Sequence, residues 1–381
     1  MTGEPHHAAF GNFRILEMTN TKTIFILLNA AFRRLRRRVS TTRRNVEGSL
    51  SRDGSEKGIP SRKLPKRCFT KLRMPLPHVL GLISMLAVVL APSFGWACAC
   101  GCGVFDVGTS SMLPEGAGGM AFLEYDYQDQ NHNWHGTSSA PDANNDDKEI
   151  RTHFVTAGLQ YMFDRSWGVQ AEVPYDFRYF KKSDGAGNIV SRSWSQLGDI
   201  RVEGIYTGFF EDMSAGVTLG FKLPTGSHTF DSGVVDRDTQ IGTGSTDITL
   251  GGFYRGNLTK DNKLDWFAQL HLDIPVLIQG DYRPGIELDT AAGLYYKGWH
   301  LHTVQITPVA QVIASERTSD EGSNANPPNS GYQRILLSPG VEIDMHPVSV
   351  YADIEVPVFQ DVRGNQVVAP WLLKVVMSYH F

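Results

Sequence analysis

The stretch Trp371-Leu372-Leu373-Lys374-Val375-Val376-Met377-Ser378-Tyr379-His380-Phe381 alternates between two faces up to the last residue of the chain. One of these faces carries Trp371, Leu373, Val375, Met377, Tyr379 and Phe381. A period of two residues is the pattern of a β-strand. An alternating strand that ends on an aromatic residue predicts the closing strand of a bacterial outer-membrane β-barrel. Because the edge strand of a soluble β-sandwich can show the same pattern, the rest of the chain decides between the two folds.

Segments of about ten residues with alternating polarity recur from Gly119 onward, and this is the length that a tilted strand needs to cross a bilayer. The clearest segment runs from Trp167 to Tyr179, where apolar and aromatic residues alternate with charged and polar ones. The sequence predicts twelve such strands, at about 119–128, 150–163, 167–180, 198–210, 214–224, 246–256, 264–275, 285–296, 300–313, 333–345, 349–359 and 370–381.

The connections between these segments alternate between short and long. Short connections are predicted at 164–166, 211–213, 257–263, 297–299 and 346–348. The others, mostly long and polar, are predicted at 129–149, 181–197, 225–245, 276–284, 314–332 and 360–369. Short periplasmic turns and long external loops alternate in this way in outer-membrane barrels. We therefore predict an all-β fold, a single antiparallel transmembrane barrel of about twelve strands over residues 119–381, in the outer membrane.

The region before the barrel divides into three parts. Residues 74–97 contain an apolar run, Val79 to Ala91, with basic residues ahead of it and small residues after it, which is the order of a secretory signal peptide cleaved after Ala97. Residues 1–73 form a basic leader that is interpreted as disordered or as the product of a start codon assigned too far upstream. Residues 98–118 form a segment with three cysteines. The chain carries a net charge of −4 and a mean hydropathy of −0.22.

The polar faces of the predicted strands converge on the barrel axis and are rich in acids. Fourteen acidic residues are predicted to face the lumen: Glu124, Asp126, Glu172, Asp176, Asp199, Glu203, Asp247, Asp273, Glu287, Asp289, Glu342, Asp344, Asp353 and Glu355. Six basic residues join them, namely Arg178, Arg201, Lys222, Arg255, Arg334 and Lys374, with His271 and His380 able to titrate. Two interpretations follow. Excess carboxylate would favour cations in an open pore, or ion pairs across a narrow interior would fill it.

Three motifs carry a resemblance to a known family. Leu197-Gly198-Asp199-Ile200, Phe221-Lys222-Leu223-Pro224-Thr225-Gly226 and Ile241-Gly242-Thr243-Gly244-Ser245-Thr246-Asp247 are similar to segments of the outer-membrane barrels associated with the meta-pathway of phenol degradation. The resemblance implies an outer-membrane channel or transporter for small molecules such as aromatic compounds. The acidic lumen departs from what a hydrophobic cargo would need. Tyr379 and Phe381 likewise resemble the C-terminal signal that the outer-membrane assembly machinery recognises.

The cysteine cluster Cys98, Cys100 and Cys102 would lie at the mature N-terminus. Closely spaced thiolates suit Cu(I) or Zn(II), so a metal site is one interpretation. Oxidation to a disulfide in the periplasm is the other, and lipid attachment to Cys98 is a third. Apart from this cluster no cofactor is predicted.

The leading functional hypothesis is an outer-membrane channel or transporter for small solutes, with an acidic lumen that favours cations. The alternative is a non-conducting structural or partner-binding barrel that uses the cysteine segment. An outer-membrane hydrolase ranks third, because His300 and His302 have no evident serine partner and no catalytic motif occurs. The predicted partners are outer-membrane lipid, lipopolysaccharide, the assembly machinery and small solutes, with no role for nucleic acid.

Overall fold

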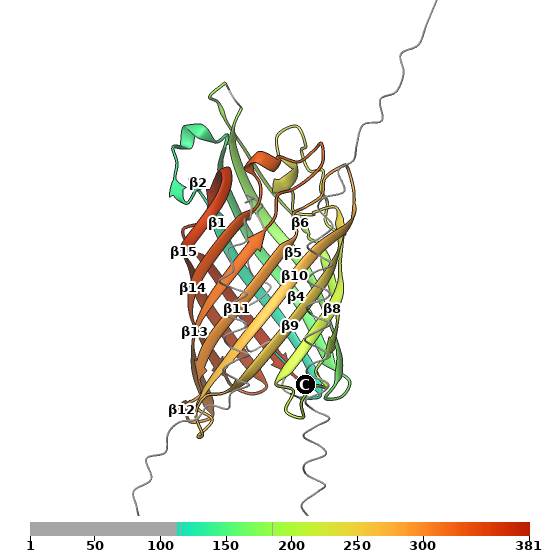
Figure 1. Cartoon of the computed structure of the whole chain (residues 1–381), viewed down its shortest axis with the longest axis vertical. Coiled ribbons are helices and arrows are strands. Elements are labelled where there is room, and N and C mark those ends of the chain that lie inside the picture. Colours follow the sequence, from blue (N-terminus) through green and yellow to red (C-terminus); the bar gives the residue numbers. More distant parts are fainter. Residues whose placement is uncertain (1–112, 115, 185) are drawn as a thin grey trace, which may run out of the picture. The chain divides into compact units, whose positions relative to one another are not determined.

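The computed structural model describes residues 113–381 except 115 and 185, and these residues form a closed antiparallel β-barrel (Figure 1). The predicted leader, the signal peptide and the three cysteines lie outside the described residues. The described part of the chain contains no helix that is long and apolar enough to cross a membrane.

Twelve strands build the barrel wall, as the sequence predicts. They are β1 (Gly118–Gln130), β4 (Asp147–Met162), β5 (Trp167–Ser183), the interrupted strand β6 (Ile189–Leu197) with β7 (Ile200–Tyr206), β8 (Ala215–Leu223), β9 (Ser245–Asn257), β10 (Leu264–Ile278), β11 (Glu287–Tyr296), β13 (Val304–Arg317), β14 (Tyr332–Asp344), β15 (Val348–Val368) and β16 (Leu372–His380). Smaller elements lie in the connections: β2 (His132–Gly136), β3 (Ser138–Ser139), β12 (Trp299–Leu301), and the 3₁₀ turns η2 (Asp142–Asn144), η3 (Arg237–Thr239) and η4 (Pro327–Asn329).

The first and last strands close the barrel. β1 pairs with β16 from Met120 opposite His380 to Gln128 opposite Leu372, so the sheet has no free edge around its circumference. At the end of this seam, the backbone N–H of Gly119 donates to the carbonyl of Phe381 at 2.7 Å, and the N–H of Phe381 donates to the carbonyl of Gly119 at 2.8 Å. The first strand therefore begins, and the last strand ends, at the end of the barrel that carries the short turns.

The two faces of the wall differ in polarity, as the alternation predicts. Outward side chains such as Leu159, Val173 and Leu219 are large, apolar and 40–59% exposed. Aromatic pairs gather near the strand ends, among them Trp167 with Tyr206, whose ring centroids lie 4.7 Å apart. An apolar exterior flanked by aromatic rings matches the hydrocarbon layer and its two interfaces.

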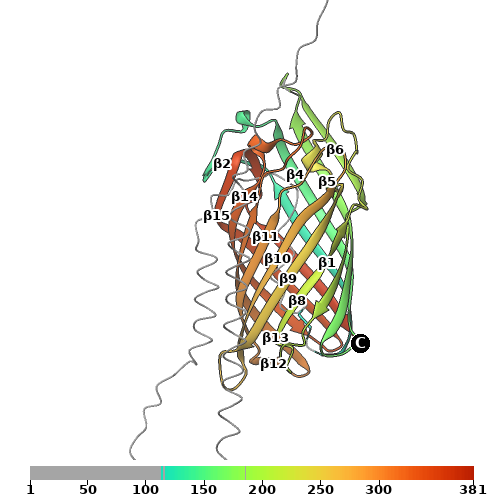
Figure 2. The same ribbon diagram turned by 45° about the vertical axis from the view of Figure 1, so that its right-hand side comes forward.

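The six predicted long connections all contain some strand residues, three of them at the strand ends that follow (Figure 2). The prediction of a loop at 360–369 is wrong, because β15 continues to Val368 and pairs there with β2, which folds back from the first long connection. The predicted loop at 181–197 contains β6, and β13 runs to Arg317. These strand ends carry polar residues outward, and we interpret them as projecting beyond the lipid, where an apolar face is not needed.

Deletion of Phe381 is expected to impair barrel assembly. The deletion removes both terminal hydrogen bonds of the seam, together with a ring that packs directly over Gly119, where an added Cβ would lie 2.3 Å from the ring carbons. Heat-modifiable migration in a gel measures the folded fraction after expression. A Phe381→Tyr variant, which keeps the ring, is the matched control. Equal folded fractions for the deletion and the full chain would contradict the expectation.

Candidate functional site: the charged lumen

The polar face of the wall lines the interior, and every lumen residue singled out from the sequence is buried or half-buried there. Glu124, Asp126, Asp176, Arg178, Asp199, Glu203, Asp353 and Glu355 are buried, and Glu172, Arg201, Lys222, Arg255 and Glu342 are half-buried. Apart from Asp199, which lies between β6 and β7, each one lies on a strand whose period of two residues sets its direction. The pairing of these charges depends on contacts between strands.

One group of charges on β7 to β10 is well paired. The guanidinium of Arg201 donates two hydrogen bonds to Asp273, at 2.8 and 3.2 Å. The Lys222 ammonium lies 2.5 Å from Asp247 and 3.9 Å from Asp273. The imidazole of His271 lies 3.2 Å from the Glu203 carboxylate. Bidentate and charge-assisted contacts of this kind join β7 to β10 and β8 to β9 along the inner face of the wall.

A second group, the seam cluster, is strongly acidic. It consists of Glu124 and Asp126 on β1, Asp353 and Glu355 on β15, and Lys374 on β16 between them. Lys374 lies opposite Asp126 on one side and opposite Asp353 on the other, and its Nζ is 3.5 Å from Glu124 Oε2. One lysine therefore stands among four carboxylates.

The carboxylates of the seam cluster differ in how they are satisfied. Asp353 Oδ2 accepts hydrogen bonds from Tyr351 and Ser338, both at 2.7 Å, and from Gln311 at 2.9 Å. Glu355 is 0% exposed, and neither of its carboxylate oxygens has a hydrogen-bond partner. One oxygen of Asp126 and the second oxygen of Asp353 are also unpartnered.

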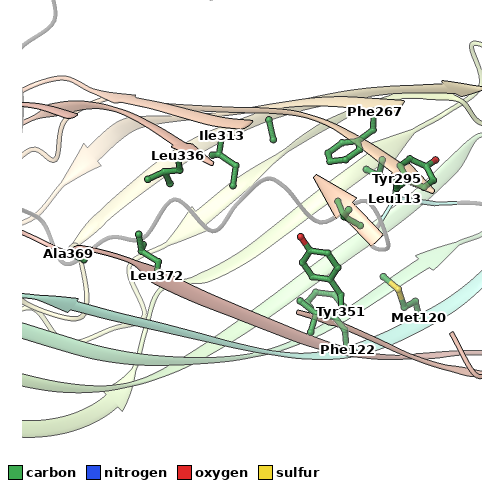
Figure 3. Packing of buried hydrophobic residues seen from close by; sticks show 13 residues of the cluster. Leu113, Met120, Phe122, Phe267, Tyr295, Ile313, Leu336, Tyr351, Ala369 and Leu372 are labelled. Atoms are coloured by element: carbon green, nitrogen blue, oxygen red, sulfur yellow. The ribbon is translucent and has the colours of Figure 1, made fainter. Parts of the chain in front are cut away.

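Apolar side chains also face the interior, which the sequence analysis did not predict. The apolar lumen cluster includes Met120 and Phe122 on β1, Tyr351 on β15, and Leu372 and Val376 on β16, together with side chains of β10, β11, β13 and β14 (Figure 3). The sequence analysis does not predict it because Leu372 and Val376 are as apolar as their outward neighbours, so polarity alone does not mark them as lumen residues. The seam cluster and the apolar lumen cluster thus share three strands.

The connection between β8 and β9, residues 224–244, packs against the inner wall at the end of the long connections, and we call it the inserted loop. Arg178 donates to the carbonyls of Thr239 and Gln240 at 2.7 and 3.1 Å. Lys182 pairs with Asp236 at 2.8 Å. Val235 and Ile241 of the loop are buried against apolar side chains of β4, β5, β6 and β15. The loop is therefore fixed to the barrel by both charged and apolar contacts.

Asp199 forms the principal attachment of the inserted loop. The wall strand is interrupted at Gly198 and Asp199, between β6 and β7, and this places the Asp199 carboxylate inside the barrel. One oxygen accepts from the N–H of Gly226 at 2.9 Å, and the other accepts from the N–H and hydroxyl of Thr243 at 2.8 and 2.5 Å. Gly242 is needed beside them, because an added Cβ would lie 2.2 Å from the Gly226 carbonyl oxygen. The three motifs that carry the family resemblance meet at this point.

Charged residues missed by the sequence analysis complete the site near the inserted loop. Arg317 was assigned to a loop, yet it is buried at the end of β13 and donates to Asp320 at 2.9 Å. Asp320 also accepts from the Tyr282 hydroxyl and the Gly285 N–H, both at 2.8 Å. The guanidinium of Arg237 lies 4.2 Å from the ring centroid of Tyr282. Continued alternation through Ile313, Ser315 and Arg317 was the available signal.

Three cavities follow one another along the interior. A cavity of about 550 Å³ at the short-turn end includes Glu342 and Lys297 in its lining. A cavity of about 130 Å³ includes Glu124, Glu172 and Glu203. A cavity of about 170 Å³ lies against the inserted loop and includes Asp126, Asp176 and Arg237. Neighbouring cavities share lining residues, Gln160 between the first two and Glu172 between the last two. Solvent-sized space therefore extends along the lumen beside its acids.

Acidification is expected to hold the inserted loop in place. Burial and, next to it, the nearby carboxylates of Asp320 and Asp236 raise the pKa of Asp238 to about 7, against the opposing effect of Arg317. This pKa lies above the ordinary value of about 3.9, which the side chain would have in a released loop. Protonation of Asp238 therefore stabilises the seated loop relative to the released one. This stabilisation is fully present below about pH 4 and is lost as the pH rises through about 7. Conductance at pH 8 should therefore exceed that at pH 5. An Asp238→Asn variant should lose this difference, and an unchanged pH profile in that variant would contradict the assignment.

Other candidate residues are not gathered into a site. His300 and His302 are exposed in the turn between β11 and β13. Within the residues that the structure describes, no group of three histidine, cysteine or acidic side chains is arranged to hold a metal ion. The proposed thiol ligands Cys98, Cys100 and Cys102 lie outside that range.

No family model matches the chain, and no curated protein matches it. Solved structures do. An outer-membrane channel from Pseudomonas putida F1 matches with a TM-score of 0.53 at 11% identity, over 72% of this chain and 100% of that one. The β domain of the Bordetella autotransporter BrkA matches with a TM-score of 0.40 at 13% identity, over 70% and 100%. The P. putida toluene transporter TodX gives 0.36 at 9%, over 69% and 90%. At these identities the likeness concerns the fold alone.

The closed barrel with an apolar exterior is an outer-membrane β-barrel, and the outer membrane is its location.

Proposed function

We propose that this barrel is a channel or transporter that passes small solutes across the outer membrane and favours cations. The succession of acid-lined cavities along the lumen carries the proposal. A soluble core would not tolerate this many ions, since burying an unpaired charge costs several kcal/mol. In a channel, water and ions that enter the lumen can solvate such a charged lining.

The imbalance of charge supports cation preference. The pairs on β7 to β10 neutralise one another, whereas the seam cluster has four carboxylates and one lysine. Glu124 lines both the cavity of about 130 Å³ and the cavity of about 170 Å³, so part of this negative charge borders the path. Carboxylates around a narrow path attract cations and repel anions. The resemblance to barrels of phenol degradation implies small organic cargo, and the apolar lumen cluster is compatible with it.

A second candidate function is a non-conducting structural or partner-binding barrel. The observation that favours it is the inserted loop, which is fixed to the wall through Asp199, Arg178 and Lys182. A loop that never leaves this position would block the external end. The choice between the two functions therefore depends on whether current flows.

Conductance of the purified barrel in planar bilayers tests the proposal. With a gradient of KCl, we expect channels whose reversal potential indicates preference for K⁺ over Cl⁻. Glu124→Gln combined with Glu172→Gln should reduce the preference, whereas Glu149→Gln, which lies on the outward face of β4, should not. Absence of channels from folded protein would support the non-conducting barrel, and preference for Cl⁻ would contradict the role of the acids.

A further inference from the structure

We propose that the outer wall of the barrel carries a binding site for the phosphorylated sugar headgroup of lipopolysaccharide. The site is a groove on the outward face of β1, β4, β5 and β6, at the end of the barrel that carries the long connections (Figure 2). We call it the outer-wall groove. It faces the membrane and not the lumen, so binding there does not depend on conduction.

The outer-wall groove has a volume of about 540 Å³. Most of its lining side chains point outward and form two rows across the strands. One row consists of Arg151, Tyr179 and Ser193, and the other consists of Tyr127, His153, Phe177 and Ser195. The serines of β6 are much smaller than the aromatic rings opposite them on β5. The wall is therefore hollowed beside those rings, with space for part of a ligand.

The groove lies where the outward face of the wall changes from apolar to charged. Toward the short turns, the next row across the strands consists of Tyr125, Val155, Tyr175 and Leu197. Toward the long connections, the next residues are Glu149 and Lys181, which lie opposite each other. This change marks the external boundary of the hydrocarbon layer. At that level the outer leaflet of the outer membrane presents the phosphorylated sugars of lipopolysaccharide.

Two cations stand at this boundary. The side chains of Arg151 and Lys181 are 40% and 37% exposed, and they lie 3.4 and 4.0 Å from the carboxylate of Glu149, which is 20% exposed. Asp129, opposite Arg151, accepts a hydrogen bond from Asn131 at 3.0 Å. A guanidinium has five N–H donors and an ammonium has three. Because both cations remain more exposed than the glutamate they share, a phosphate group can approach them from the membrane side.

The rest of the groove suits a sugar ring. The guanidinium of Arg151 lies 5.0 Å from the ring centroid of Tyr179, so the cation stands beside an aromatic surface. Phe177 is 46% exposed, and the hydroxyls of Ser193 and Ser195 lie on the neighbouring strand. An aromatic face packs against the C–H groups of a sugar, and hydroxyls exchange hydrogen bonds with it. A glycerophospholipid offers the phosphate without the sugar ring, so the groove favours the glycolipid.

Native mass spectrometry of the full barrel in detergent measures the binding. The probes are lipid A with both phosphates, lipid A without phosphates, and phosphatidylglycerol. We expect the phosphorylated lipid A to bind roughly tenfold more tightly than either of the others. Equal affinity for phosphatidylglycerol would overturn the recognition of the sugar, and equal affinity for the dephosphorylated lipid would overturn the role of the cations. A complex of two barrels without lipid would show that the groove is a contact between copies, which also overturns the proposal.

Variants locate the site. Arg151→Gln is expected to weaken binding of phosphorylated lipid A by roughly tenfold, and Ser193→Phe to weaken it by filling the groove. Glu149→Gln should instead strengthen binding, because it removes the carboxylate that competes with the phosphate.

Arg165→Gln is the matched control. Arg165 is exposed in the short turn that joins the same two strands, β4 and β5, at the opposite end of the barrel, so its loss should leave the affinity unchanged. Gel migration with and without heating confirms that each variant is folded. Unchanged affinity in folded Arg151→Gln, or in folded Ser193→Phe, would overturn the site.

Discussion

Replacing Asp199 with alanine is expected to release the inserted loop and to produce the largest rise in conductance of any single substitution in this barrel. The carboxylate accepts three hydrogen bonds from Gly226 and Thr243, and hydrogen bonds to a charged group contribute about 1.5–3 kcal/mol each. Their loss would move the loop from a seated state to one that leaves the external end open for much of the time.

Single-channel recording in planar bilayers measures this change, and limited proteolysis within 224–244 reports the exposure of the loop directly. Asp231→Ala is the matched control, because Asp231 lies in the same connection and pairs with Arg192 near the surface, outside the Asp199 attachment. We expect it to alter conductance little. Equal proteolysis and equal current in Asp199→Ala and the unsubstituted barrel would show that the loop does not control access.

Replacing Lys374 with methionine is expected to cause the largest loss of stability. The side chain is buried between β1 and β15, and the change would leave four carboxylates without the cation nearest to them. Removing one partner from a buried ion pair costs on the order of 3–5 kcal/mol. Equilibrium unfolding in urea, followed by tryptophan fluorescence in lipid vesicles, measures the loss.

A comparison with Lys182→Met separates burial from charge. Lys182 pairs with Asp236 at the external end, where both side chains retain contact with solvent, so the expected loss is at most about 1 kcal/mol. Adding Glu355→Gln to Lys374→Met should restore part of the stability, because it removes one of the carboxylates left behind. A loss for Lys374→Met no larger than for Lys182→Met would mean that water solvates the seam cluster.

The wall of this barrel follows from the sequence because each strand that crosses the lipid carries a period of two residues. The strand Trp167–Ser183 illustrates both the success and its limit. Residues 167–180 alternate between apolar and polar or charged side chains, and the predicted strand over this range agrees with β5. Its last residues, Lys181 to Ser183, have no apolar face and fall in a predicted loop. The partner strand β6 falls in the same predicted loop because its outward residues Ser191, Ser193 and Ser195 are polar.

The site was predictable in its charges but not in its contacts. Inward direction depends only on local alternation, so Glu124, Asp353 and Lys374 were identified as lumen residues. Their association depends on the seam, which joins residues about 250 positions apart in the chain. The attachment of the inserted loop spans 44 residues between Asp199 and Thr243, and it has no counterpart in any local pattern. Contacts of this kind arise only when the barrel closes.

The seam between β1 and β16 has a consequence for the order of events during biogenesis. Gly119 and Phe381 stand at opposite ends of the barrel sequence, so their pairing closes the longest loop that the fold contains, and the entropic cost of that closure must be met by strands already paired. Non-local closure of this kind is slow. A chain interrupted before Leu372 would therefore remain an open sheet with two unpaired edges. Such a sheet would be degraded by proteases or would aggregate through its edges, and it would not form an open pore in the membrane.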